Sequence, residues 1–304
     1  EIDIDDDALR YGAVSVDIDR GLRAAFITVH GPPGSEPSDP AELIAAGASA
    51  WLLAAARQLD DAILRLRFNE PEIGTWVLRT EGNPAHVMAA EEPLATHPDQ
   101  WLVREIRLYW SRTLKRLDLS ARTLVALAEP GSCFTGLLAE LALAADRSLM
   151  LEGMRPGSDL PAAHLRLTEA NDGWFPMANG LSRLATRFWG DGAALDAARA
   201  QAGKDLLAAE AAGAGLVTFT PDEIDWDDEV RLTLEERASF SPDALTGMEA
   251  NLRFAGPETM ETKIFGRLSA WQNWIFQRPN AVGGDGALRR YGTGSRPSYD
   301  RART

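Results

Sequence analysis

The stretch "GSCFTGLLAELALAAD", Gly131 to Asp146, decides how this chain folds. It follows the apolar run "TLVALAEP", residues 123–130, which is typical of a buried strand ended by Pro-Gly. The residues after the turn are nearly all small or apolar, which favours a buried helix. Read as a helix that extends through "GLLAELALAADRSLML" to Leu151, the segment places Glu140 among apolar neighbours three and four positions away. A carboxylate there must be paired, hydrogen-bonded or neutralised by a raised pKa.

Strand and helix signals alternate outward from this stretch. "AAFITVH" (24–30) and "GTWVLRTEGN" (74–83) indicate strands, and residues 41–67 and 101–117 have helical patterns. This alternation predicts an α/β fold. We expect residues 1–22 to be an N-terminal extension or linker and residues 23–222 to form the core. Residues 223–304 form a helical region, with three helices separated at Ser241-Pro242 and Gly256-Pro257, followed by an irregular Gly- and Arg-rich tail.

The composition is that of an ordinary globular protein and excludes several functions. The 304 residues carry a net charge of −14, which is unfavourable for binding nucleic acid or an anionic membrane. One cysteine and four scattered histidines predict no disulfide and no metal site. No apolar run reaches a membrane span and no signal-peptide pattern is present, so we expect a cytoplasmic protein. The acidic start without methionine suggests a piece of a longer protein.

Two strand-to-helix turns are the candidate functional segments of a sequence that lacks the common catalytic and nucleotide-binding motifs. No P-loop, no strand-linked GxGxxG and no GxSxG elbow is present. The turns "TEGNPAHVMAAE" (80–91) and "GSCFTGLLAELALAAD" (131–146) each follow a strand and lead into small or apolar residues. Two such turns can aim two backbone N–H groups at one point, as an oxyanion hole for a thioester carbonyl requires.

These segments resemble the crotonase (enoyl-CoA hydratase/isomerase) superfamily. "EGNPAHVMAAE" is similar to the first oxyanion turn of that family, and "GLLAELALAAD" is similar to its Gly-Gly-Gly-x-Glu-Leu-Ala helix. The resemblance implies a crotonase-like ββα spiral, with Met88 and Leu137 as the backbone oxyanion donors and Glu140 as the first catalytic glutamate. "TEANDGWFPMANGLSRL" (168–184) matches the next motif and makes Glu169 the second catalytic glutamate.

The tail narrows the resemblance to one branch of the superfamily. "GPETMETKIFGRLSAWQNWIFQRPNAVGGDGALRRYGTG" (256–294) resembles the C-terminal end of crotonase-like lyases of aerobic benzoate degradation. These lyases open the ring of 2,3-dihydro-2,3-dihydroxybenzoyl-CoA and release a semialdehyde-CoA and formate. They are considerably longer than this chain. The resemblance implies a CoA-thioester substrate and no separate cofactor, because CoA is part of the substrate; the CoA-binding residues are not identified.

Departures from the family pattern leave two alternatives open. Leucine stands at position 137 and alanine at position 89, where the family has glycine, and Glu91 replaces the usual aspartate. Such changes fit either a reshaped pocket or a half whose catalysis lies in an N-terminal part of the full-length protein. Beside the ring-opening lyase, the alternatives are an ordinary enoyl-CoA hydratase or isomerase and a catalytically silent crotonase-like domain that assembles the full-length enzyme. Glu140 also has a structural interpretation, as a carboxylate satisfied by an arginine or by backbone N–H groups.

Three further features have simple structural interpretations. Cys133 follows a strand end, where most lone cysteines are core residues. The basic residues of helix 101–117 could meet CoA phosphates, but such a run is more often a solvated face. The run "IFGRLSAWQNWIF" (264–276) is too apolar for an exposed helix, so we expect it to pack on the core or on another subunit of a homo-oligomer.

Overall fold

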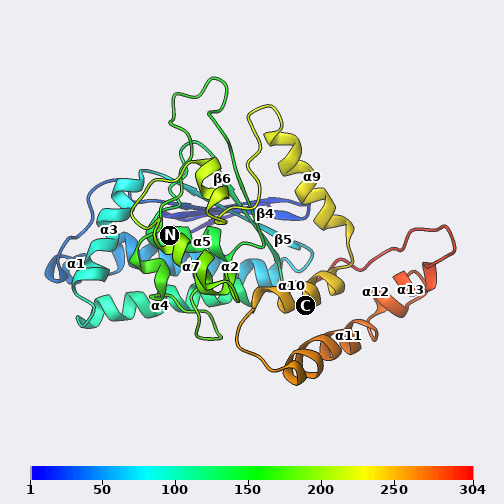
Figure 1. The fold of residues 1–304 in the computed structure, drawn as a ribbon. Helices are drawn as coiled ribbons and strands as arrows, with labels where there is room; N and C mark the ends of the chain where they lie inside the picture. The colour runs from blue at the N-terminus through cyan, green and yellow to red at the C-terminus, as the bar shows by residue number, and fades with distance from the viewer. Residues whose placement is uncertain (1, 304) are drawn as a thin grey trace.

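One sheet of seven strands organises the part of the chain that the structure describes, residues 2–303 of a computed structural model (Figure 1). The strands are Asp3–Ile4 (β1), Ala8–Arg10 (β2), Val14–Asp19 (β3), Ala24–His30 (β4), Thr75–Glu81 (β5), Thr123–Ala128 (β6) and Arg147–Met150 (β7). They lie in chain order, antiparallel from β1 to β4 and parallel from β4 to β7. The carboxyl ends of β4, β5 and β6 therefore share one edge, and the turns that follow them meet there.

The N-terminal residues correct one prediction. Residues 2–22 are not an extension or linker, because β1, β2 and β3 pair with one another and, through β3, with β4. In β3, "VSVDID", Val14 and Val16 are fully buried while Asp17 and Asp19 are exposed. This alternation is the pattern of a strand with one solvated face. Of the acidic residues at the start of the chain, Asp3 lies in β1, and Asp5, Asp6 and Asp7 lie in the exposed turn between β1 and β2.

Helices cover one face of the sheet and enclose the main core. They are Pro40–Ala46 (α1), Trp51–Asn69 (α2), Pro84–Thr96 (α3), Trp101–Asp118 (α4), Ala139–Ala144 (α5), Arg183–Arg187 (α6), Gly192–Arg199 (α7) and Ala208–Gly213 (α8). The predicted helices 41–67 and 101–117 are α1 with α2, and α4. The indole of Trp110 is fully buried and its Nε1–H donates to the carbonyl of Leu52 (2.8 Å), which joins α4 to α2.

A second, smaller core lies on the opposite face of the sheet. There α9, Trp226–Ser239, packs Trp226 and Leu234 against Val77 of β5 and Val125 of β6. Figure 1 shows α9 on the side of the sheet away from α2 and α4. The parallel strands β5 and β6 are thus buried on both faces, as their continuous apolar sequences require.

The stretch from Gly136 to Leu151 contains a shorter helix than predicted. A 3-10 turn at Gly136–Leu138 leads into α5, which ends at Ala144, and residues 147–150 form β7. Ala145 is already extended (φ −71°, ψ 141°). The Asp146 carboxylate accepts the backbone N–H of Leu124 (2.8 Å), which places β7 beside β6. Residues 147–150 therefore form a strand despite their helical pattern, because pairing with β6 completes the sheet.

The C-terminal region forms an arm on a helical base. The base is α10, Pro242–Arg253, and the arm, residues 258–294, contains a π-helical turn (Thr262–Leu268), α11 (Ser269–Ile275), α12 (Pro279–Val282) and α13 (Ala287–Arg290). The breaks at Ser241-Pro242 and Gly256-Pro257 are confirmed, although α13 lies in the stretch expected to be irregular. Figure 1 shows α11, α12 and α13 extending away from the sheet before the chain returns to α10. Within residues 2–303, no helix has the length and apolar character needed to cross a membrane.

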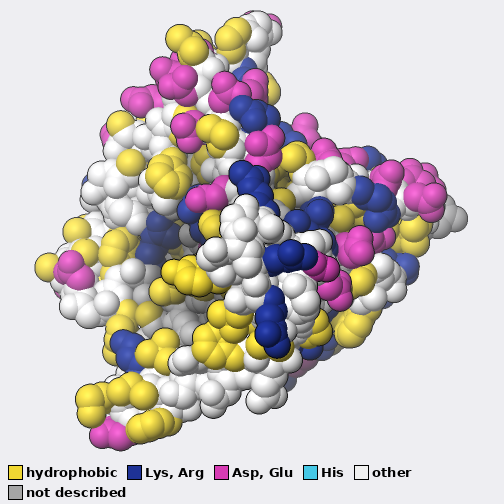
Figure 2. Space-filling model, turned by 90° about the vertical axis from the view of Figure 1, so that its right-hand side faces the viewer, with side chains coloured by type: hydrophobic (Ala, Val, Ile, Leu, Met, Phe, Trp, Pro, Cys, Tyr) yellow, Lys and Arg dark blue, Asp and Glu magenta, His cyan; other side chains and the backbone are white. Residues whose placement is uncertain are grey.

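The apolar run of the arm is not buried in the core of this chain. Neither the π-helical turn nor α11 contains a buried residue, and Phe265 is 70% exposed. Figure 2, which faces this side of the molecule, shows hydrophobic side chains gathered along its lower part. Packing against the core, one of the two environments predicted for residues 264–276, is therefore wrong for most of the run. Packing on another subunit stays a prediction.

Candidate functional site

The two turns singled out by the sequence are in contact. After β5, the backbone N–H of Gly82 donates to the carbonyl of Gly131 (3.0 Å), in the turn that follows β6. Asn83 then caps α3, accepting the N–H of Ala85 (2.9 Å), and Pro84 takes the first helical position. The adjacency expected of an oxyanion site is therefore present at this edge of the sheet.

The predicted donor Leu137 is occupied by a side chain of this chain. Its backbone N–H donates to Oε2 of Glu91 (2.5 Å), while Oε1 of Glu91 accepts the hydroxyl of Thr168 (2.6 Å). Leu137's own side chain is 1% exposed and packs in the core, so it does not fill the site. A carboxylate oxygen thus lies where a thioester oxygen would accept this hydrogen bond.

Gly136 makes room for that carboxylate. Its φ is +51°, and a Cβ built on it would lie 2.2 Å from Oε2 of Glu91. Glycine is required here by backbone conformation and by contact. Glutamate is also one methylene longer than the aspartate of the family pattern, which extends its reach toward Leu137. The retained glycine and the glutamate therefore form a matched pair.

The other predicted donor, Met88, lies inside α3. The helix begins at Pro84, so the N–H of Met88 is directed along the helix toward the carbonyl four residues earlier. Only the first four N–H groups of a helix are free for other acceptors. The structure therefore gives Met88 no free backbone donor.

Glu140 is held in a buried ion pair. Its Oε2 lies 2.8 Å from Nη1 of Arg183, and its Oε1 accepts the amide of Asn171 (2.8 Å). Arg183 also pairs with Asp118 through Nε (3.1 Å) and Nη2 (2.6 Å). The three charged side chains are at most 2% exposed. Burial raises the pKa of the Glu140 carboxyl, and the charge of Arg183 opposes that rise. Glu140 therefore fits its structural interpretation, in which an arginine satisfies the carboxylate on an apolar helix face.

Glu169 is separated from this network. It begins a short 3-10 helix, Glu169–Asp172, capped by the Thr168 side chain, and its own side chain is exposed. Among the described residues its carboxylate has no hydrogen-bond or ion-pair partner. It borders what we call the Trp174 cavity, of about 400 Å³, which is lined by Met88, Ala89, Glu91, Glu92, Ala95, Thr168, Glu169 and Trp174. Glu140 does not line this cavity.

Glu91 is the titratable group of this cavity that sequence reasoning missed. The side chain is almost fully buried, and this burial raises its pKa, while the hydrogen bonds from Thr168 and Leu137 oppose the rise. Proximity to Glu140 raises it further. The available signal was the combination of a longer acid at position 91 with an unchanged glycine at position 136.

The other candidate residues, Cys133 and the basic side chains of α4, have contacts typical of structural residues. Cys133 is fully buried, and burial raises the pKa of its thiol to about 11, so it carries no thiolate near neutral pH. On α4, Arg112 and Arg116 pair with Asp60, and Arg107 lies over the ring of Trp174 at 4.5 Å. Within residues 2–303, no three His, Cys, Asp or Glu side chains are grouped as a metal site requires.

We expect Gly136→Ala to destabilise the chain by about 2 kcal/mol or more, through backbone strain and loss of the Glu91 contact. Gly180→Ala is the matched control, because Gly180 also has positive φ (+83°) but open space around it. Chemical denaturation measures both. The excess cost at Gly136 should disappear when Glu91→Ala is also present; an excess that persists there would contradict the contact.

Solved structures with a similar fold define the structural class of this chain. The fold matches the enoyl-CoA hydratase of Geobacillus kaustophilus HTA426 with a TM-score of 0.68 at 17% identity, over 97% of this chain and 98% of that one. It matches an enoyl-CoA hydratase of Mycobacterium smegmatis with a TM-score of 0.63 at 15% identity, over 95% and 99%. The chain therefore has the crotonase fold that its motifs indicated.

The sequence then identifies a particular relative. The chain is 49% identical over 297 residues to the benzoyl-CoA-dihydrodiol lyase of Aromatoleum evansii. The match covers 98% of this chain but 53% of the relative, so the chain spans about half the length of the curated protein it matches. No family model matches the chain. The predicted resemblance to this lyase is therefore confirmed over the part of the relative that the chain covers.

Proposed function

We propose that the protein containing this chain is a lyase that opens the ring of a dihydrodiol of benzoyl-CoA, yielding a semialdehyde-CoA and formate. The support is 49% identity to a protein named for that activity, over 98% of the chain, together with a crotonase fold. We also propose a cytoplasmic location, because the relative is a bacterial protein named for a CoA-thioester substrate. Its substrate carries its own CoA, and the proposal needs no other cofactor.

We further propose that this part of the lyase has a closed oxyanion site and serves as a scaffold, while ring opening uses another part of the full-length protein. The observation that carries this proposal is the Glu91 carboxylate on the Leu137 N–H. A bound thioester oxygen would have to displace a carboxyl group with hydrogen bonds to both of its oxygens. The ion pair that holds Glu140 and the position of Met88 inside α3 support the same conclusion.

An ordinary hydratase is disfavoured on the same grounds. In the hydratase alternative, both predicted glutamates act on one substrate, so both must lie within hydrogen-bond reach of the reacting centre. Glu140 has both oxygens engaged by Arg183 and Asn171 and does not line the Trp174 cavity. The scaffold proposal therefore does not require the two predicted catalytic glutamates, Glu140 and Glu169, to act together on one substrate.

A second candidate keeps the chemistry in this chain. Glu91 and Glu169 both border the Trp174 cavity, whose volume of about 400 Å³ is within the range of ligand sites. If Glu91 leaves the Leu137 N–H, the freed donor and the two carboxylates form an acid–base site. The raised pKa of Glu91 would suit such a role.

Formate release by the full-length protein distinguishes the two candidates. Under the scaffold proposal, we expect Glu169→Gln and Glu91→Gln each to change turnover by less than about threefold, since general acid–base groups contribute about 10² or more. Glu169 is the cleaner position, because its exposed side chain makes no contact that the substitution would break. A loss of about 10² or more in both variants, with unchanged thermal stability, would establish the second candidate.

We also propose that the arm joins subunits of a homo-oligomer. Phe265 and Leu268 are 70% and 52% exposed on the same turn of the arm, with Met260 69% exposed nearby in sequence. An apolar surface of this kind is typical of a protein–protein contact. The matching surface would belong to a second copy, because most soluble oligomers are homo-oligomers.

Substituting the arm tests this assembly. We expect Phe265→Glu with Leu268→Glu to convert the full-length protein to a smaller species, because charges in an apolar interface oppose association. Light scattering after gel filtration measures the mass. Leu232→Glu, on the exposed face of α9 (50% exposed), is the control and should leave the mass unchanged. An unchanged mass in the arm variant would rule out the arm as the contact.

A further inference from the structure

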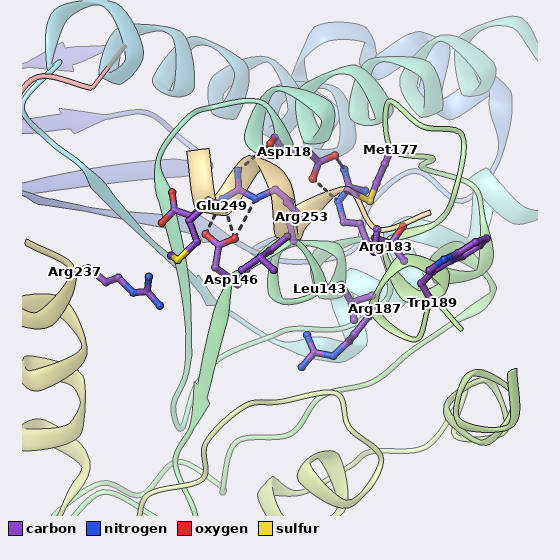
Figure 3. Close-up of a pocket in the computed structure, with 16 residues that line it drawn as sticks. Asp118, Leu143, Asp146, Met177, Arg183, Arg187, Trp189, Arg237, Glu249 and Arg253 are labelled. Atoms are coloured by element: carbon purple, nitrogen blue, oxygen red, sulfur yellow. Dashed lines mark hydrogen bonds and ion pairs between the residues drawn. The ribbon is translucent and has the colours of Figure 1, made fainter. Parts of the chain in front are cut away.

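A second cavity lies on the other side of Arg183 from the candidate site. We call it the arginine cavity: it has a volume of about 350 Å³ and lies between α5, α6, α9 and α10. Four arginines line it, Arg183, Arg187, Arg237 and Arg253, with three carboxylates, Asp118, Asp146 and Glu249. Figure 3 shows Arg187 and Arg237 approaching this space from opposite sides.

The three carboxylates already have cationic partners. Arg183 pairs with Asp118 (2.6 Å), Arg253 with Asp146 (2.6 Å) and the incoming tail residue Arg303 with Glu249 (3.2 Å). Arg183 also pairs with Glu140 (2.8 Å), so these three arginines leave no positive charge unmatched.

Arg187 and Arg237 are the two cations left over. Arg187 uses only Nε, which donates to the carbonyl of Gly215 (2.6 Å), and its two terminal nitrogens have no partner among residues 2–303. Arg237 has no ion pair or hydrogen bond within the same residues, and its Nε is buried. Burial lowers the pKa of Arg187, as expected for a cation without a carboxylate. In a chain of net charge −14, two unmatched cations facing one cavity are a local exception.

The cavity also has an unsatisfied hydroxyl and an apolar wall. The hydroxyl of Thr186, one residue before Arg187, is buried without a hydrogen-bond partner. Leu143, Met177 and Met248 supply apolar surface to the same space. Buried polar atoms without partners are uncommon and require an explanation.

We propose that the arginine cavity binds a small organic phosphate, with the phosphate between Arg187 and Arg237 and its apolar body against Leu143 and the two methionines. A phosphate monoester carries close to two negative charges near neutral pH and offers several acceptor oxygens. Two guanidinium groups from opposite sides match this charge, and each can donate more than one hydrogen bond. This site is separate from the Trp174 cavity and does not depend on the proposed lyase activity.

Calorimetric titration of the full-length protein with phenyl phosphate tests the proposal. We expect binding, and we expect Arg187→Gln and Arg237→Gln each to weaken it about tenfold or more, because each removes charged hydrogen bonds. Benzoate, a monoanion with the same ring, should bind more weakly than phenyl phosphate. Inorganic phosphate should also bind more weakly, because it lacks the apolar body.

Arg231→Gln is the matched control, since Arg231 lies on α9 like Arg237 but is exposed and paired with Asp228 and Glu235. It should leave the affinity unchanged. Without ligand, the Arg237→Gln variant should melt at the same temperature as the native protein or higher, because it removes an unmatched cation and breaks no hydrogen bond among the described residues. No binding of phenyl phosphate at millimolar concentration would overturn the proposal. Native affinity in both cavity variants, or an equal loss in Arg231→Gln, would also overturn it.

Discussion

Arg183→Met is expected to lower the free energy of unfolding by about 4 kcal/mol or more, because removing one partner of a buried ion pair leaves an uncompensated charge. Arg183 serves two carboxylates, Asp118 and Glu140, and all three side chains are at most 2% exposed. The substitution would leave two acids in the core at once. Chemical denaturation of the chain measures the loss.

The loss should depend on pH in a defined direction. Burial already raises the pKa of both Asp118 and Glu140, and without Arg183 both values would rise further. An acid with a higher pKa in the folded state holds its proton after the unfolded chain has released it. Stability then falls as pH rises from the unfolded value, about 4, through the folded value. The deficit of Arg183→Met should therefore be smaller at acidic pH than at neutral pH.

Arg199→Met is the matched control for this experiment. Arg199 pairs with Asp172 at 2.8 Å, but its side chain is 41% exposed and that of Asp172 is 47% exposed. A solvated pair contributes about 0.5 kcal/mol, so the control should be nearly neutral. Similar losses in the two variants, or a deficit in Arg183→Met that grows toward acidic pH, would contradict the buried network.

Glu91→Ala is expected to increase the affinity of the chain for an acyl-CoA by about tenfold or more, since a hydrogen bond to a charged group is worth about 1.5–3 kcal/mol. The substitution removes the carboxylate that competes for the Leu137 N–H. It also enlarges the Trp174 cavity, which Glu91 lines. Titration with benzoyl-CoA measures the change.

Free CoA is the control ligand, because it lacks the thioester carbonyl and should show no gain. Glu92→Ala is the control variant, since Glu92 lines the same cavity but does not contact Leu137. If Glu92→Ala increased the affinity for benzoyl-CoA equally, the cause would be the loss of a negative charge from the cavity and not the release of the Leu137 N–H. An unchanged affinity in Glu91→Ala would indicate that the Leu137 N–H is not available to a thioester at all.

Local sequence patterns predicted most of the elements that position the site. β4, β5, β6 and α4 were recognisable because each carries its own apolar periodicity. The N-terminal strands were missed because the chain opens with acidic residues, Asp3 and Asp5 to Asp7, and this opening carries no strand or helix signal of its own. β7 was missed because "SLML" continues the apolar pattern of the preceding helix, and only pairing with β6 distinguishes the two.

The partners of the buried acids required the fold. The sequence posed the question of Glu140, but its answer, Arg183, lies 43 residues away on another helix. Glu91 is 46 residues from Leu137, and the family pattern directed attention to the donor and not to the acid beside it. Contacts of this length depend on how two strand-to-helix turns meet, which no local pattern encodes.

The carbonyl stretching frequency of benzoyl-CoA labelled with ¹³C at the thioester tests the closed site most directly. An oxyanion donor lowers this frequency by polarising the carbonyl. With the native chain at saturating concentration, we predict that the carbonyl frequency of benzoyl-CoA equals its value in water. With Glu91→Ala, we predict a lower carbonyl frequency. A lowered frequency with the native chain would contradict the account, because it would show the Leu137 N–H bound to substrate while Glu91 is present.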